Sequence, residues 1–208
     1  TIKRVVTVVI AVAIIGALVS LFLPVSTPGT DIPTSETKAL QLKLRHLLSP
    51  RAAHKEYEFS NAEATLIAND IAGLRKNTTA KEKEEEETPD GEAGDSAGGK
   101  GAVLVPQHIS VEFRQQNYVR VVLKSSLFGK LAIYTSLVGR INVPEGAKPE
   151  FRPTGAYIGK FPCPGPLTAV AESRIAPLYK GDENLNRLLQ RMADVETTSG
   201  KATVTAKR

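Results

Sequence analysis

The sequence lacks tryptophan altogether and holds only one cysteine, Cys163, and three histidines in 208 residues. A single cysteine excludes an internal disulfide and a multi-cysteine metal site. His46, His54 and His108 stand far apart, without the H-x-x-H or H-E-x-x-H spacing of a metal centre. The chain also lacks G-x-S-x-G, Walker and G-x-G-x-x-G motifs. We therefore expect a protein without catalytic activity, metal or cofactor.

Charged side chains are missing from residues 5–25, which form a long apolar run. A helix of that length, at about 1.5 Å per residue, spans the roughly 30 Å hydrocarbon core of a bilayer. Lys3 and Arg4 precede the run, so the positive-inside rule predicts a cytoplasmic N-terminus and an extracytoplasmic body. A cleaved signal peptide is the alternative. The apolar region of a signal peptide is normally shorter than the run at residues 5–25, and it ends in a small-residue cleavage site that is missing here. We therefore favour an uncleaved signal anchor formed by residues 1–25.

Small residues recur on one face of the expected membrane helix, at Ala13, Gly16, Ala17 and Ser20. Such a face lets two helices approach closely and predicts pairing with a partner membrane protein or a second copy of the chain. The alternative is that these residues only reflect the ordinary composition of membrane spans.

Large apolar residues are missing from residues 76–101, so we expect a disordered acidic insertion there. Between Lys81 and Asp95 eight carboxylates face two lysines, a net −6 that leaves +11 for the rest of a chain whose total is +5. A basic body favours anionic partners such as lipid head groups. An extracytoplasmic body would rarely meet nucleic acid, which we exclude as a partner.

After a Pro-, Ser- and Thr-rich linker at residues 26–35, residues 36–75 read as the helical part of the body. A stripe of leucines on one face predicts a first helix that ends before Pro50. The stripe consists of Leu40, Leu44, Leu47 and Leu48. This basic helix either packs on its own domain or lies on anionic lipid. Ser60 and Glu63 form a capping box that predicts a second helix. Its expected buried stripe is Ala64, Ile67, Ile71 and Leu74.

From residue 102 to residue 208 the apolar period changes to two, which indicates strands joined by short turns in an antiparallel sheet. The alternating positions begin with Ile109, Val111 and Phe113 and continue with Val119, Val121 and Leu123. Two helices should follow. The second is capped by Asp182 and carries a stripe that extends to Met192, and residues 201–207 read as a closing strand. The fold class predicted is α+β, a mostly antiparallel sheet with packed helices behind one transmembrane helix.

Cys163 lies in the stretch YIGKFPCPGPL, between Pro162 and Pro164 and four residues after Gly159. A helix begins within a few residues and Lys160 is near, so a reactive thiol is one interpretation. The prolines stiffen the chain on both sides and no histidine follows closely, so we favour a structural corner in which Cys163 is a small packed apolar residue.

The run from Val119 to Leu167 resembles the YpmS-like family of membrane-anchored bacterial proteins, which has no assigned activity. Gly159, Pro162 and Pro164 match the family's G-x-x-P-x-P corner, and FSNAEATLIANDI is similar to its early helix with an asparagine motif. Related membrane-anchored domains are similar to tubular lipid-binding folds, so the resemblance implies a lipid groove by analogy.

Together these features predict a single-pass protein of the inner or plasma membrane whose body binds a lipid or another envelope ligand. The alternative is a scaffold or assembly subunit that pairs through its transmembrane helix. The sequence offers no residues that identify the ligand.

Overall fold

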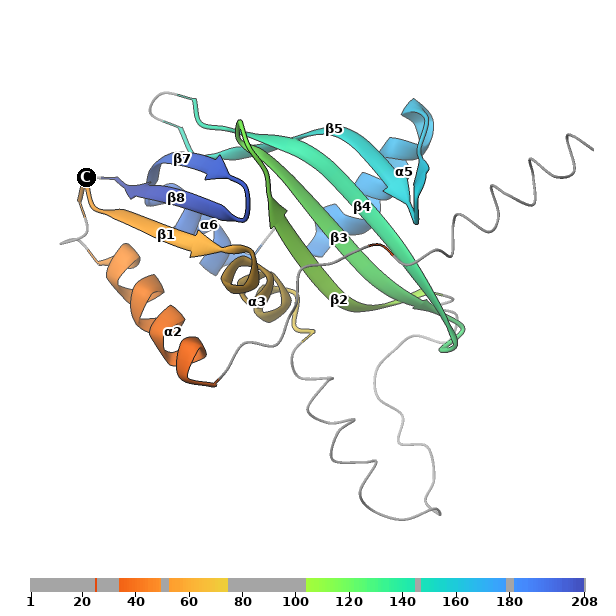
Figure 1. The fold of residues 1–208 in the computed structure, drawn as a ribbon, viewed down its shortest axis with the longest axis horizontal. Helices are drawn as coiled ribbons and strands as arrows, with labels where there is room; N and C mark the ends of the chain where they lie inside the picture. Colours follow the sequence, from red (N-terminus) through yellow and green to blue (C-terminus); the bar gives the residue numbers. More distant parts are fainter. Residues whose placement is uncertain are drawn as a thin grey trace, which may run out of the picture.

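The computed structural model describes residues 25, 34–49, 53–74, 104–144, 147–178 and 182–207. These residues form the α+β fold predicted from the sequence, with antiparallel strand pairing throughout. The strands divide into two sheets rather than one. A three-stranded sheet has the order β1-β8-β7, and a five-stranded sheet has the order β2-β3-β4-β5-β6 (Figure 1).

The five-stranded sheet is a meander whose strands come from one continuous stretch. It comprises β2 (Leu104–Phe113), β3 (Tyr118–Leu127), β4 (Leu131–Asn142), β5 (Glu150–Ile158) and the two-residue β6 (Phe161–Pro162). Because side chains alternate along a strand, Ile109, Val111 and Phe113 point to the same face, as predicted. Their partners on β3, at Leu123, Val121 and Val119, continue that apolar face across the sheet.

The three-stranded sheet joins the two ends of the domain. It contains β1 (Glu56–Ser60), β7 (Met192–Thr198) and β8 (Lys201–Ala206). The prediction that a helix continues through Met192 was wrong, because α6 (Glu183–Gln190) ends first and Met192 starts β7. Pairing of Val195 with Val204 places this stretch in the sheet.

The two sheets meet at their turns. Gly200 donates its backbone N–H to the carbonyl of Phe113, and the N–H of Phe113 donates to the side-chain oxygen of Asn61 at 2.7 Å. Asn117, in the β2–β3 turn, accepts a hydrogen bond of 2.9 Å from the N–H of Thr197. These bonds fix the angle between the sheets and leave their apolar faces turned toward one another.

Helix α3 (Asn61–Ile71) starts at the predicted capping box, with Ser60 and Glu63 exchanging hydrogen bonds of 2.8 and 3.2 Å. Its buried residues are polar, Thr65 and Asn69, whereas only Leu74 of the expected apolar stripe is buried and the rest are half-buried. The polar row pairs with the free edge of β2. Asn69 both donates to the carbonyl and accepts from the N–H of Ile109, at 2.6 and 2.9 Å. Helix α3 thereby protects an edge strand from pairing with another chain.

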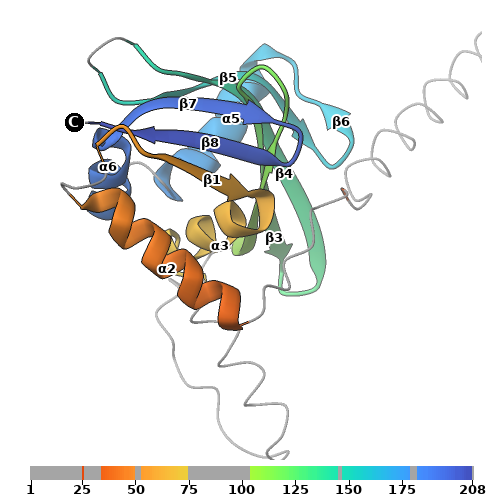
Figure 2. The ribbon, with the colours of Figure 1, turned by 60° about the vertical axis from the view of Figure 1, so that its left-hand side comes forward.

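Helix α2 (Thr34–Leu48) packs on its own domain, as one of the two interpretations predicted (Figure 2). Leu40 and Leu47 are buried in the core. Leu48 is 40% exposed, so its expected place on the buried stripe was wrong, because the helix ends there and turns the side chain outward. The helix starts at Thr34, so the last two residues of the expected linker belong to it.

The two remaining helices are α5 (Gly165–Ile175), on the apolar face of the large sheet behind β4 and β5 in Figure 1, and α6. A 3-10 turn (Ala176–Leu178) follows α5. Asp182 caps α6, as predicted, by accepting a 2.7 Å hydrogen bond from the N–H of Leu185. Among the helices of the described residues, none is both long enough and apolar enough to cross a membrane. The expected anchor, residues 1–25, lies outside this part of the chain except for Val25, as does the insertion at 76–101.

Candidate functional site: an apolar cavity between the two sheets

The apolar interior is split into two clusters rather than one contiguous core. One gathers around the small sheet, with Phe59, Leu188 and Val195, and the other lies under α5, with Leu137 and Ile175. Three half-buried residues touch both clusters: Val111, Val121 and Phe151. Most domains of this size have one continuous core. The division marks a place where the facing elements do not fill the space between them.

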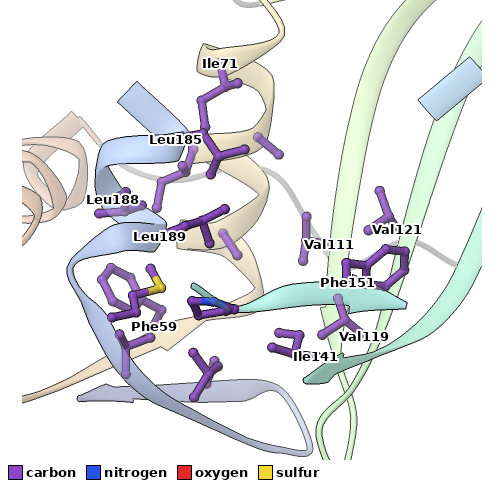
Figure 3. A pocket seen from close by; sticks show the side chains of 18 of the residues that line it. Phe59, Ile71, Val111, Val119, Val121, Ile141, Phe151, Leu185, Leu188 and Leu189 are labelled. Atoms are coloured by element: carbon purple, nitrogen blue, oxygen red, sulfur yellow. The ribbon is translucent and has the colours of Figure 1, made fainter. Parts of the chain in front are cut away.

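That space is a cavity of about 540 Å³. All but four of its lining residues are apolar or proline. Figure 3 shows α3 and α6 on one side and the large sheet on the other, with the side chains of Ile71, Leu185, Leu188 and Leu189 opposite Val111, Val121 and Phe151. Both the volume and the composition lie in the range of small-molecule binding sites.

A void of this size is energetically significant. Protein interiors are close-packed, and a dry internal cavity costs about 24 cal/mol per Å³. At that rate a sealed, empty cavity of 540 Å³ would cost about 13 kcal/mol, as much as the whole stability of an ordinary domain. The cavity is therefore better understood as a site open to solvent on one side, which an apolar ligand can fill.

The four polar lining residues mark the rim. Lys148 and Glu150 are exposed, on the segment that leads into β5, while Asn186 of α6 and Glu172 of α5 are half-buried. Lys148 Nζ donates to Asn186 Oδ1 across the rim at 3.3 Å. Glu150 also pairs with Arg152 at 3.6 Å. When Arg152 is counted, the rim has two cations and two carboxylates, so its charges balance, unlike those of the basic body as a whole.

A second feature is a set of polar side chains on the face of the large sheet that is turned away from the cavity. His108, Ser110 and Glu112 alternate with the cavity-facing residues of β2. Four buried side-chain atoms on this face have no hydrogen-bond partner among the described residues: His108 Nε2, Ser110 Oγ, Arg120 Nε and Ser136 Oγ. Unpaired buried polar atoms are unusual in native proteins. Burial lowers the pKa of His108, and the Lys124 cation opposite it on β3 lowers the pKa further.

The predicted corner runs from the end of β5 through β6 into α5. Gly159 has a φ of 59°, in the left-handed region that favours glycine, and donates to the carbonyl of Tyr134 at 2.6 Å. Pro164 is the N-cap residue of α5. Cys163 packs against the cluster under α5, and burial raises the pKa of its thiol although a backbone hydrogen bond at Ile158 partly offsets this. The structural role of Cys163 stays a prediction.

The residues of the expected pairing face, Ala13, Gly16, Ala17 and Ser20, lie outside the described residues, so pairing through the membrane helix stays a prediction. Within the described part of the chain, no group of three or more His, Cys, Asp or Glu side chains is placed to hold a metal ion. The cavity was not identified from the sequence. Its lining residues have the same alternating and helical patterns as ordinary core residues, and no local signal separates the two.

No family model, curated protein or solved structure matches this chain.

Proposed function

We propose that the domain is a binding module for a lipid or similar amphiphile, with the apolar chain in the cavity and the polar head at the rim. The observation that carries this proposal is the apolar cavity of about 540 Å³ between the two halves of the core. A purely structural domain gains nothing from leaving that space unfilled, because each buried methylene would contribute about 0.8 kcal/mol.

The rim bears on the head group. Lys148 offers a cation and Asn186 an amide, while Glu150 and Glu172 contribute carboxylates. With Arg152, which pairs with Glu150, the rim has two cations and two carboxylates, so its charges do not favour an anionic head. We therefore infer that the cavity accepts a zwitterionic or neutral amphiphile at least as well as an anionic one.

Native mass spectrometry of the full chain, extracted in mild detergent, tests the proposal. The wild-type protein should retain one amphiphile, and Ala68→Phe, which adds a ring at a cavity-lining position of α3, should abolish retention. Ala169→Phe is the matched control, since residue 169 is exposed on α5. Lipid that only surrounds the apolar N-terminal segment would be retained equally by all three proteins.

Two results would contradict the proposal: a wild-type protein that carries no amphiphile, or an Ala68→Phe variant that carries as much as the control. Thermal melting of each variant separates loss of binding from loss of folding. If Ala68→Phe does not fold, Ile67→Trp fills the neighbouring cavity position and serves in its place.

A further inference from the structure

The tip of the β3–β4 hairpin exposes a group of large apolar residues. Phe128 is 72% exposed and Leu131 is 49% exposed, and at the start of the adjacent β2 Val105 is 48% exposed. The three positions are close together, because Leu127 pairs with both Leu131 and Leu104. Figure 1 shows this end of the large sheet reaching beyond the helices and the small sheet. We name Val105, Leu127, Phe128, Lys130 and Leu131 the apolar tip.

The turn itself holds an unfavourable residue. Lys130 donates its N–H to the carbonyl of Leu127 at 3.1 Å, and the two central residues, Phe128 and Gly129, have φ values of 52° and 73°. Two positive φ values define a type I′ turn, whose first central residue is normally Asn, Asp or Gly. A bulky aromatic side chain is a genuine outlier in that conformation. Phe128 gains no burial in return.

The turn at the other end of β3 has the same backbone type and can be compared with it. The β2–β3 turn has central residues Gln116 and Asn117 with φ values of 60° and 62°, and Tyr118 donates to Gln115 across it. That turn uses polar residues, as an exposed type I′ turn should. The β2–β3 turn thus uses residues that suit its backbone, whereas the β3–β4 turn has an exposed phenylalanine. The backbone geometry of the turn therefore does not explain why residue 128 is a phenylalanine.

Charge indicates what the tip contacts. From Tyr118 to Asn142 the hairpin contains no Asp or Glu. Of its four cations, Lys130 is in the turn and Lys124 lies six residues before it on β3, whereas Arg120 and Arg140 lie at the opposite end of the hairpin. Lys130 is exposed in the turn itself. An exposed apolar turn that carries a lysine and has no carboxylate on its hairpin fits the interface of a bilayer with anionic lipids, where apolar side chains insert and basic ones stay at the head groups.

We propose that the apolar tip inserts into the surface of an anionic bilayer and holds the domain against it. Phe128, Leu131 and Val105 enter the interface, and Lys130 remains among the head groups. This contact is separate from the cavity and does not require that the cavity binds a lipid.

The absence of tryptophan gives a direct test, because one introduced tryptophan reports alone. The full chain carrying Phe128→Trp is reconstituted in vesicles of phosphatidylcholine and phosphatidylglycerol, with and without bromine on the acyl chains. Gln116→Trp, at the other end of β3 and in the same turn type, is the control. Ten residues of strand separate the two turns, about 33 Å at the usual rise.

We expect bromolipid to quench the emission of the Phe128→Trp variant at least twofold and to leave the Gln116→Trp variant unchanged. Adding Lys130→Glu to the Phe128→Trp variant should reduce the quenching by half or more. Equal quenching at the two turns, or none at position 128, would overturn the proposal. A blue-shifted emission at position 128 without quenching would also overturn it, because that result indicates contact with protein. Amphiphile retention by the same variants should equal wild type, which keeps this test independent of the cavity.

Discussion

The hydrogen bonds between Asn69 and the edge of β2 offer the sharpest test of how the domain is held together. The side chain is 6% exposed and makes three hydrogen bonds, donating to the carbonyls of Thr65 and Ile109 and accepting from the N–H of Ile109. Asn69→Ala would leave the N–H and C=O of Ile109 without partners. Each unsatisfied buried group costs about 1–3 kcal/mol, or roughly 2–6 kcal/mol for the pair.

Alanine returns about 0.5 kcal/mol through its higher helix propensity, so the net loss of stability should be about 1.5–5.5 kcal/mol. For a domain of this size that corresponds to a fall of roughly 3–20 °C in the melting temperature. Urea unfolding and thermal melting, both followed by circular dichroism, measure the loss. Asn142→Ala, at an exposed position of β4, is the control and should change stability by less than about 0.5 kcal/mol. A variant at position 69 that is as stable as the control would refute the view that α3 completes the edge of the sheet.

Three further predictions follow from single residues. Phe128→Asn should stabilise the domain by about 0.5–1 kcal/mol, because asparagine suits the positive φ of the turn; an unchanged urea midpoint would show that the turn is not strained. Because burial lowers the pKa of His108, the unfolded chain takes up a proton first as the pH falls below about 6.5, so stability should decrease there. His108→Gln should flatten the decrease in urea midpoint between pH 7 and 5, whereas the exposed His54→Gln should not. Finally, Cys163→Ala should lower the free energy of unfolding by at most about 2 kcal/mol and should retain amphiphile binding. The native thiol should resist alkylation until the domain unfolds, and rapid labelling of the folded protein would contradict a packed corner.

The sequence by itself determined the local elements of this protein. The alternation of Ile109, Val111 and Phe113 predicted a strand with one apolar face, and Ser60 with Glu63 predicted the start of α3. Asp182 likewise marked the first turn of α6. These signals are local, because capping and side-chain periodicity act between residues only a few positions apart. They were therefore readable without knowledge of the fold.

Only the tertiary structure decided how those elements combine. Met192 continues the apolar spacing of a helix, yet it starts β7, because pairing with β8 outweighs a weak local preference. The amphipathic pattern of α3 hid the fact that its polar row, Asn61, Thr65 and Asn69, is the one that faces β2. The cavity depends on distances between residues far apart in the chain. An apolar residue that lines a void and one that fills a core have the same pattern in the sequence, and only the packing of the two sheets distinguishes them.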